Sequence, residues 1–352
     1  MPARVFLLLI LTPLLACTER SAAVSGNCLE VVLTGTQGGP PAVNGLAGAG
    51  TLVRYGTTGT SCADVVMQFD VGRSTTESLS QVGVSTRDVD AVFLTHLHSD
   101  HTEGLASLLL LRWHYLGEVL DIICSDDVES AAGHTLSCRD YTVHIADAMI
   151  ASGEIAQRIA ENNKRHADGP AGLVELRTVG LPLPSEPGAV VWESGDVVVM
   201  AIATSHIAGS LAYRVDTPAG SVVIGGDAGS STPVSERESS TSEAVEILAA
   251  GADILVHSVI HPVFGPGNGS NFPAVAYLRQ SSVGDLGAMA ERAGVAQLLL
   301  THLIPALNIA SHGPFAVPGQ PLTAADFEAQ LRASGYKGEV HVGRDLLTIR
   351  LD

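Results

Sequence analysis

The sequence predicts an α/β protein with mixed β-sheets. Short runs rich in Val, Ile and Leu alternate along the chain with helical stretches, and this interleaving is typical of sheets covered by helices. The runs Leu211–Val215 and Ser221–Ile224 are separated by a Gly-containing turn, which predicts an antiparallel hairpin and therefore mixed rather than purely parallel sheets. A chain of 352 residues can bury a sizeable core, and we expect one domain from residue 28 to residue 352.

The individual elements are expected from the spacing of apolar residues. Strands are expected at Leu29–Thr34, Thr51–Tyr55, Val65–Phe69, Ala91–Thr95, Leu120–Cys124, Val197–Ala203, Leu211–Val215, Ser221–Ile224, Ile254–Val256, Gln297–Thr301 and Leu346–Leu351. Helices are expected at Thr75–Val82, Glu103–Trp113, Ala146–Asn163, Ser242–Ala249, Val283–Ala293 and Ala324–Ser334. Charged residues from Arg158 to Arg165 give the third of these helices a polar face, and such a face is more often solvent-exposed than functional.

The first 17 residues have the zones of a secretory signal peptide. Arg4 precedes an apolar run that ends at Leu15, and this run is too short to span a bilayer as a permanent helix. The run ends in Leu-Leu-Ala-Cys, which resembles a bacterial lipobox and predicts that Cys17 is lipidated; plain cleavage further along the chain is the alternative. Residues 18–27 are small and polar and are expected to form a tether. We therefore expect an exported protein of the periplasm or cell envelope.

The four cysteines after Cys17 are expected to form two disulfides, because an oxidising compartment favours such pairs. Three pairings exist, and Cys28–Cys62 with Cys124–Cys138 is favoured. The first pair flanks an apparent hairpin, and the second encloses a short loop-rich segment. Four reduced, buried thiols are the alternative.

The formal net charge of −18 argues against a broad basic surface. Binding to a nucleic acid duplex is driven largely by Lys and Arg residues that neutralise phosphates, so nucleic acid is not an expected partner. No second apolar stretch is long enough to cross a membrane, so membrane contact is expected only through the N-terminal lipid. The expected partner is a small-molecule ester, and a homodimer remains open.

A dense group of potential metal ligands follows the expected strand at Ala91–Thr95. His96, His98, Asp100 and His101 fall within six residues. A carboxylate and three imidazoles in one turn compete for the same partners, and a bound divalent cation resolves that competition. Isolated histidines are usually structural, but four ligands at this spacing predict a metal site.

Further candidate ligands recur close after other expected strands. His206 follows Val197–Ala203, Asp227 follows Ser221–Ile224, His257 follows Ile254–Val256, and His302 follows Gln297–Thr301. In layered α/β folds sites assemble along the carboxyl edge of a sheet, so these distant residues are expected to converge on one cleft.

Together these motifs resemble the metallo-β-lactamase superfamily, in its branch of ribonuclease Z, related phosphodiesterases and arylsulfatase-like proteins. The resemblance covers roughly residues 29–351. It includes Leu33-Thr34-Gly35-Thr36, Phe69-Asp70-Val71-Gly72, the His-rich motif, Ser205-His206, Ala212-Tyr213-Arg214, Gly225-Gly226-Asp227 and Leu300-Thr301-His302. The His-rich motif is highly specific, whereas the other matches are weak singly. The fold that the resemblance implies is a four-layer αββα sandwich of two mixed sheets.

The resemblance also implies a ligand set. His96, His98 and His206 would bind one metal, Asp100, His101 and His302 the other, and Asp227 would bridge them. Nitrogen and oxygen donors without cysteine suit two Zn²⁺ ions, with Mn²⁺ or Fe as alternatives. Asp70 would support a ligand through hydrogen bonds, or would merely form a turn before Gly72.

A hydroxide that bridges two divalent ions is a nucleophile at neutral pH, and Asp100 is expected to orient it and handle its proton. The leaving group needs an acid. His257 resembles the proton-donating histidine of the ribonuclease Z branch, where Glu typically follows; here Ser258 follows, and His261 is the alternative donor. His341 in an expected strand and His312 in a Gly/Pro-rich loop are expected to be structural, although His312 at the cleft rim is also placed to touch substrate.

We therefore expect an exported di-zinc hydrolase of phosphodiester or sulfate esters, because the resemblance associates a bridging carboxylate at Asp227 with phosphodiesterase and thioesterase branches. The alternative is a hydrolase of lactones, thioesters or β-lactams. A di-iron redox protein is disfavoured because His98 stands where such proteins have Glu, and a metal-binding module without turnover fits poorly with a complete ligand set. Ribonuclease Z activity itself is disfavoured by the predicted export, the acidic charge and the lack of a long basic arm.

Overall fold

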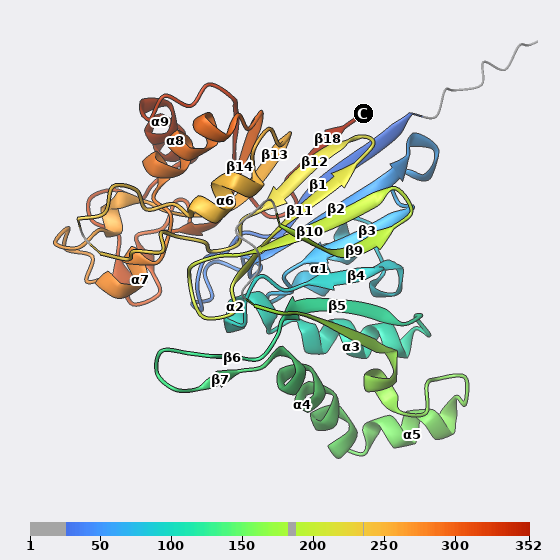
Figure 1. The fold of residues 1–352 in the computed structure, drawn as a ribbon. Coiled ribbons are helices and arrows are strands. Elements are labelled where there is room, and N and C mark those ends of the chain that lie inside the picture. The colour runs from blue at the N-terminus through green and yellow to red at the C-terminus, as the bar shows by residue number, and fades with distance from the viewer. Residues whose placement is uncertain (1–25, 182–187, 235) are drawn as a thin grey trace, which may run out of the picture.

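Two seven-stranded β-sheets pack face to face, and helices cover the outer face of each sheet (Figure 1). The computed structural model describes residues 26–181, 188–234 and 236–352. The arrangement is the four-layer αββα sandwich that the sequence predicted. The predicted signal peptide, Cys17 and nearly all of the predicted tether lie outside the described residues.

The first sheet combines antiparallel and parallel strands. Its order is β18 (Thr348–Leu351), β1 (Asn27–Gly35), β2 (Gly50–Thr57), β3 (Val65–Phe69), β4 (Ala91–Phe93), β5 (Leu120–Ser125) and β8 (Val174–Val179). Strands β18, β1, β2 and β3 pair antiparallel, whereas β3, β4, β5 and β8 run parallel. The carboxyl ends of β3 and β4 therefore lie at one edge.

The second sheet repeats this division. Its order is β17 (Glu339–Val342), β14 (Gln297–Ile304), β13 (Ile254–Ile260), β12 (Gly220–Ile224), β11 (Leu211–Thr217), β10 (Val197–Ala203) and β9 (Ala189–Ser194). β11 and β12 form the predicted antiparallel hairpin, while β12, β13, β14 and β17 run parallel. Because β11 is antiparallel to both of its neighbours, β10 runs in the same direction as β12.

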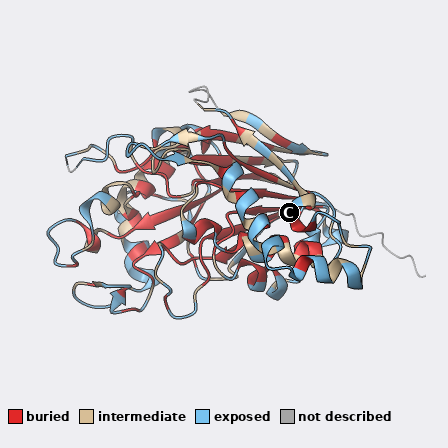
Figure 2. Cartoon of the chain, turned by 90° about the horizontal axis from the view of Figure 1, so that it is seen from below, coloured by how far each residue is buried: buried red, intermediate tan, exposed pale blue. Residues whose placement is uncertain are grey.

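The helices divide between the two outer faces. They are α1 (Thr75–Gln81), α2 (Ser99–Thr102), α3 (Leu105–His114), α4 (Cys138–Ala151), α5 (Glu154–Glu161), α6 (Glu243–Leu248), α7 (Ala274–Leu278), α8 (Val283–Ala293) and α9 (Ala324–Ala333). Apolar residues of α1 and α3 pack on the first sheet, and those of α6, α8 and α9 pack on the second. A third cluster, which includes Phe69, Phe93 and Tyr213, fills the space between the sheets. Figure 2 shows buried residues running along the strands beneath exposed helix surfaces.

The predicted elements are largely confirmed, with one clear error among the helices. The helix expected at Ala146–Asn163 is in fact two, α4 and α5. Gly153 separates them with a φ of +78°, a left-handed conformation that glycine adopts at low cost. Strands β8 and β9 and the short helices α2 and α7 were not predicted. The two helices are short, and β8 has alternating exposed residues with few consecutive apolar side chains, whereas the apolar run Ala189–Trp192 that opens β9 was overlooked.

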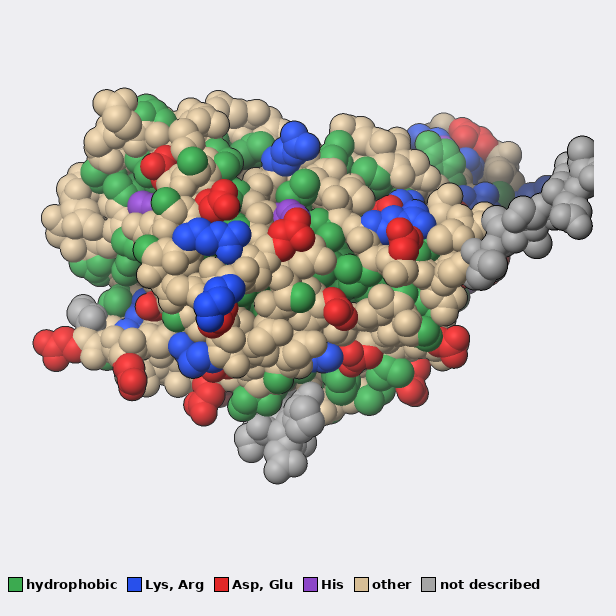
Figure 3. Space-filling model, turned by 90° about the horizontal axis from the view of Figure 1, so that it is seen from above, with side chains coloured by type: hydrophobic (Ala, Val, Ile, Leu, Met, Phe, Trp, Pro, Cys, Tyr) green, Lys and Arg blue, Asp and Glu red, His purple; other side chains and the backbone are tan. Residues whose placement is uncertain are grey.

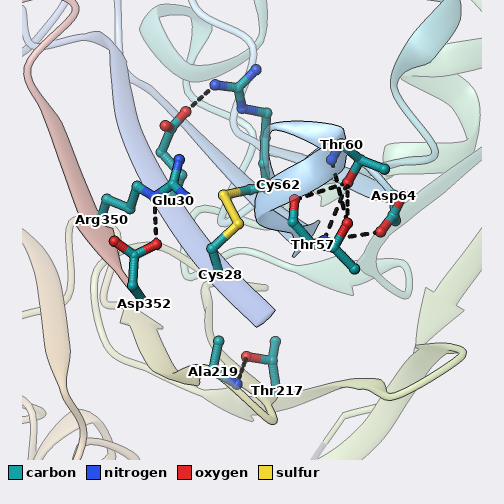
Figure 4. The surroundings of a disulfide bond; sticks show 11 residues. Cys28, Glu30, Thr57, Thr60, Cys62, Asp64, Thr217, Ala219, Arg350 and Asp352 are labelled. Carbon is teal, nitrogen blue, oxygen red and sulfur yellow. Dashed lines mark hydrogen bonds and ion pairs between the residues drawn. A yellow bond between two sulfur atoms is a disulfide. The ribbon is translucent and has the colours of Figure 1, made fainter. Parts of the chain in front are cut away.

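Both favoured disulfides are present. Cys28 in β1 bonds to Cys62 beyond β2, with a Cα–Cα distance of 5.5 Å, and Figure 4 shows this bond beside the hydrogen-bonded turn at Thr57. Cys124 at the end of β5 bonds to Cys138 at the start of α4, with a Cα–Cα distance of 6.4 Å. Each bond links a strand covalently to a segment later in the chain. A search of the described helices finds none that combines the length and hydropathy needed to cross a membrane.

Candidate metal centre

The His-rich motif occupies a tight turn between β4 and α2. His98 is the N-terminal cap residue of α2, and Asp100 and His101 lie in that helix. The turn packs against the loop after β3, where the Val71 N–H donates to the His101 carbonyl at 2.7 Å. A Cβ atom on Gly72 would lie 2.3 Å from the Asp100 carbonyl oxygen, so only glycine allows this approach. The local backbone thus fixes four side chains at the carboxyl edge of the first sheet.

The second sheet delivers the remaining residues to the same edge. His206 lies in the loop after β10, and Asp227 lies in the loop after β12, both as predicted. These two strands run in the same direction, so their carboxyl ends meet at one edge. Because the two sheets stack, the loops of the second sheet face the His-rich motif of the first.

His302 reaches the site through a β-bulge. It was expected just beyond the strand, but β14 continues to Ile304. The register pairs Ser258 with Thr301 and Val259 with Leu303, so His302 is an extra residue without a partner on β13, and its φ is +46°. A bulge changes the direction in which a side chain points. Here His302 Nε2 lies 3.0 Å from Asp100 Oδ2 and 3.3 Å from Asp227 Oδ2.

Three imidazole nitrogens meet in a first group. His98 Nδ1 lies 2.9 Å from His96 Nε2 and 3.2 Å from His206 Nε2. His206 Nδ1 donates to the Arg279 carbonyl, which can only accept, so His206 Nε2 carries a lone pair. His96 Nδ1 donates to Thr95 Oγ1, whose own proton goes to Asp70, so His96 Nε2 also carries a lone pair. Lone pairs that face one another at such distances form a site for a cation.

A second group contains Asp100, His101 and His302. His101 Nε2 lies 3.6 Å from Asp100 Oδ2, and this nitrogen is buried without a hydrogen-bond partner among the described residues. Asp227 touches both groups: its Oδ2 lies 3.7 Å from His206 Nε2 and 3.3 Å from His302 Nε2, and its Oδ1 lies 3.5 Å from His101 Nε2. All seven predicted ligands are therefore brought together, with Asp227 between the two groups.

Asp70 orients the ligands and does more than form a turn. Its carboxylate accepts from the Thr95 N–H at 2.7 Å, from the Thr95 hydroxyl at 2.8 Å and from His101 Nδ1 at 2.8 Å. Accepting from Nδ1 leaves the lone pair of His101 on Nε2, which faces the other ligands. The Asp70 backbone has a φ of +54°, a costly conformation for a non-glycine residue that these three hydrogen bonds help to hold.

The site's charges are coupled. Burial raises the pKa of Asp100, but His101 and His302 outweigh burial and bring this pKa down to about 2. Asp227 behaves similarly, because His302 and His101 hold its pKa well below the usual range despite burial. Burial lowers the pKa of His206 to about 4 and holds that of His96 well below its ordinary value. Burial lowers the pKa of His101, but Asp227, Asp70 and Asp100 outweigh burial and raise it well above its ordinary value. The two carboxylates, His96 and His206 thus have the protonation states that metal ligands need, whereas a metal ion at His101 would displace a proton.

These donors fit a pair of zinc ions. Ligand atoms of a tetrahedral zinc lie about 2.0–2.1 Å from the metal and hence about 3.3 Å from one another. The distances within and between the two groups run from 2.9 to 3.7 Å. The orphaned His101 Nε2 and Asp227 Oδ1 are buried polar atoms that a metal ion would satisfy. Histidine and carboxylate donors of this kind can hold a metal at three overlapping positions.

His257 is not at a strand end. It lies inside β13, which continues to Ile260, and its ring is fully buried. Its Nδ1 donates to the Ser258 carbonyl at 2.6 Å, and its Nε2 has no hydrogen-bond partner among the described residues. His257 is also absent from the cleft lining, so the structure does not bring it to the cleft in the way that it brings the metal ligands. The alternative donor His261 accepts from the Val263 N–H and packs against Phe327, away from the cleft.

The other two histidines have structural partners, as expected. His341 lies in β17, 3.2 Å from Gln297 Oε1. His312 does line the cleft, but its Nε2 donates to the Gly38 carbonyl and its Nδ1 accepts from the Ala306 N–H. This contact holds the loop in which the Gly39 N–H points at His302 Nε2, 3.1 Å away.

A cleft of about 260 Å³ opens over the metal ligands, and several of its residues were not predicted from the sequence. Phe272 and Phe315 form one apolar part of its wall, with ring centroids 5.1 Å apart. Arg279 and Gln280, just beyond α7, form a polar part, and Gln280 donates to Asp227 Oδ2 at 3.2 Å. Phe272, Arg279 and Gln280 lie in irregular segments, and Phe315 lies in the two-residue strand β16 (Phe315–Ala316), so no hydrophobic periodicity marks them.

Comparisons with known proteins find related sequences and a shared fold. Residues 61–138 match the family model of the anti-Pycsar protein Apyc1. Ribonuclease Z of Mycobacterium marinum is 29% identical over 326 residues, which cover 90% of this chain and 97% of the relative. Ribonuclease Z of Mycolicibacterium paratuberculosis is 30% identical over 339 residues, with 92% of this chain and 99% of the relative covered.

Solved structures share the fold. Human tRNase Z, short form, matches with a TM-score of 0.59 at 16% identity, covering 92% of this chain and 99% of that one. The metallo-β-lactamase fold protein YhfI from Bacillus subtilis matches with a TM-score of 0.58 at 18% identity and the same coverage. The chain therefore belongs to the metallo-β-lactamase superfamily, in its branch of ribonuclease Z and related phosphodiesterases, a group of metal-dependent hydrolases that act on ester bonds.

Proposed function

We propose that the protein is an exported di-zinc hydrolase that cleaves phosphodiester or sulfate ester bonds. The observation that carries the proposal is the position of Asp227, whose carboxylate lies within 3.7 Å of histidine nitrogens from both ligand groups: His206 in the first, and His101 and His302 in the second. A carboxylate so placed supports a pair of ions held roughly 3.5–4 Å apart. Such a pair can hold both the attacking and the leaving oxygen of an in-line displacement at phosphorus or sulfur.

The chain's own residues would prepare the reaction in three ways. His96, His98 and His206 would hold one ion, and Asp100, His101 and His302 the other, with Asp227 shared. The bound ions would supply an activated water and polarise the ester. Asp100 lines the cleft with a low pKa, so it is ionised and would orient that water by accepting a hydrogen bond from it.

Two other substrates are weighed against phosphodiesters. Acyl substrates such as lactones or β-lactams would use the same ions, but they do not require a nucleophile and leaving group held by two metals. The curated relatives bear the name ribonuclease Z, and tRNA is the alternative that this name suggests. The net charge of −18 weighs against it, and Figure 3 shows basic side chains scattered among acidic ones on the face drawn there.

The test combines metal analysis with a substrate panel. Zinc-loaded protein should carry close to two ions per chain and hydrolyse bis(p-nitrophenyl) phosphate or a nitrophenyl sulfate faster than a lactone or a β-lactam. Asp227→Ala should lose at least one ion, because the shared ligand is gone. A wild-type protein with one ion, an unchanged metal content in Asp227→Ala, or a preference for the acyl substrates would contradict the proposal.

The exported location is part of the same proposal and has its own test. It rests on the signal-peptide pattern of the first 17 residues and on the paired cysteines of the folded domain. Fractionation of the producing cells should find the protein in the envelope, and Cys17→Ala should release it from the membrane fraction. Recovery of the wild-type protein from the cytoplasm with its N-terminal segment intact would refute export.

A further inference from the structure

The segment after α7 places one cationic side chain over the metal ligands. Among the described residues that line the cleft, Arg279 is the only lysine or arginine. Its Nε donates to the Val275 carbonyl at 3.3 Å, and this is its side chain's only hydrogen bond within the described part of the protein. None of the ion pairs formed there includes Arg279. Its two terminal nitrogens are therefore available to a ligand.

Other arginines of the protein are used differently. Arg112 is buried and donates to the carbonyls of Thr86, Val89 and Glu118, so its guanidinium is occupied by hydrogen bonds within the protein. Arg214 pairs with Asp216. Arg279 is half-buried beside the cleft without an acidic partner, and an arginine left in this state is well suited to bind an anion.

Arg279 is also held at a fixed place relative to the metal ligands. Its carbonyl accepts from His206 Nδ1 at 3.2 Å, and the next residue, Gln280, donates to Asp227 at 3.2 Å. A Cβ on Gly229 would lie 2.5 Å from the Arg279 carbonyl oxygen, so the backbone is tightly packed here. Burial is the main cause that lowers the pKa of His98, and the nearby positive charge of Arg279 contributes to the same shift. The cation therefore lies beside the first nitrogen group.

Another part of the cleft wall is apolar, in contrast to Arg279, and this limits the substrate further. Phe272 and Phe315 meet edge to face, and Pro40, Pro41 and Ile304 extend this apolar surface. The cleft volume of about 260 Å³ lies below the usual range of about 300–1,000 Å³ for ligand pockets, so a single ring with its ester group nearly fills it.

We propose that Arg279 binds a non-bridging oxygen of an anionic ester while Phe272 and Phe315 pack against its apolar substituent. The substrate is then a small phosphodiester or sulfate ester with at least one apolar, preferably aromatic, group. This inference rests on the proposed function and adds the residues that select the substrate. An anion is held between a fixed guanidinium and the metal-binding edge, and a flat apolar group lies against the aromatic wall.

The test separates the two contacts with two variants and one surface control. Arg279→Met removes the charge and keeps the aliphatic stem, Phe315→Ala removes part of the aromatic wall, and Arg292→Met removes an exposed ion pair with Glu246 far from the cleft. For each zinc-loaded protein, metal content is measured first, then inorganic phosphate binding by calorimetry. KM and kcat follow for bis(p-nitrophenyl) phosphate, methyl p-nitrophenyl phosphate and the neutral ester p-nitrophenyl acetate.

Arg279→Met should keep its metal and bind inorganic phosphate roughly 10- to 100-fold more weakly, since a hydrogen bond to a charged group is lost. Its KM for both diesters should rise by a larger factor than its KM for the neutral ester. Phe315→Ala should bind phosphate normally, and its KM should rise for both diesters, because each offers one aromatic ring to the wall. Arg292→Met should match the wild type throughout.

Three outcomes would overturn the inference. They are an Arg279→Met protein that binds phosphate as tightly as Arg292→Met does, one that loses its metal, and one that loses activity on the neutral ester to the same extent as on the diesters. Each would show that Arg279 does not recognise the anion. A wild-type protein that hydrolyses only acyl substrates would instead refute the proposed function, so the two failures are distinguishable.

Discussion

At the scale of single residues, Asp70 shows how one carboxylate orients two metal-binding histidines. Its carboxylate accepts a hydrogen bond directly from His101 Nδ1. It also accepts one from the Thr95 hydroxyl, which itself accepts a hydrogen bond from His96 Nδ1. Each bond fixes the proton on Nδ1 and leaves the lone pair on Nε2. The tautomers are thus set before any ion binds, which reduces the reorganisation that metal binding requires.

The proton-donor hypothesis for His257 makes a prediction that a packed core histidine would not share. Removing a general acid typically costs about 10²–10⁴-fold in rate, but less when the leaving group is already a stable anion. His257→Ala should therefore keep its metal and lose more activity on alkyl esters than on nitrophenyl esters. His206→Ala should instead lose metal and slow every substrate alike. Equal slowing of both ester types by His257→Ala, measured where chemistry limits the rate, would leave His257 a core residue.

His312 should make the fold sensitive to acid. Burial lowers its pKa from 6.5 to about 4, so between these values the unfolded chain binds a proton that the folded protein does not. Stability should therefore be full above pH 6.5 and fall as the pH drops toward 4. The expected loss from this group between pH 7 and pH 5 is about 2 kcal/mol.

Urea unfolding of the wild type and His312→Gln at both pH values isolates this contribution, because the titration of the metal ligands is common to both proteins. The variant should lose less stability than the wild type on going from pH 7 to pH 5. Identical losses would mean that His312 is protonated in the folded protein.

At the scale of elements, the loop after β3 and the helix α2 form one packed unit. A Cβ on Gly72 would lie within 2.6 Å of backbone atoms of Asp100, Gly48 and Ala49, none of which can swing aside as a side chain could. Gly72→Ala should cost about 1–3 kcal/mol of unfolding free energy and also weaken metal binding, because the Asp100 backbone must move. Gly284→Ala is the matched control, since nothing lies within 4 Å of its added Cβ. Calorimetric unfolding and zinc titration check both effects, and equal behaviour of the two variants would contradict the packing argument.

The elements also show what a sequence can and cannot predict. Strand β10 is a continuous apolar run and β3 is apolar except for Gln68, and the predicted bounds of both agree with the structure. The His-rich motif is a local pattern, so its four ligands were identified together. Arg279 and Gln280 act only because α7 folds back over the cleft, and a five-residue helix has no periodicity that would reveal this. His257 was misplaced because nothing in Ile254–Ile260 marks where its strand ends.

At the scale of the whole molecule, the two disulfides bear on the proposed export. The Cys28–Cys62 and Cys124–Cys138 bonds close segments of 34 and 14 residues. In a chain-entropy account, loops of this size contribute about 3–4 kcal/mol each. Labelling of thiols in denatured mature protein should therefore modify almost none of the four cysteines before reduction, and reduction should lower the melting temperature. Four reactive thiols without reductant would contradict both the pairing and the oxidising location.

The bulge at His302 also reverses the alternation of side chains between the two faces of β14. Leu298 and Leu300 pack beneath the outer helices, with Leu299 facing the opposite sheet. A regular pleat would turn Leu303 to the same side as Leu299, yet Leu303 joins Leu298 and Leu300. The residues before and after His302 therefore follow opposite alternations between the two faces of the sheet. A one-residue deletion at this point would therefore restore an unbroken alternation and expel the ligand in the same step, whereas His302→Ala would keep the phase and lose only the imidazole.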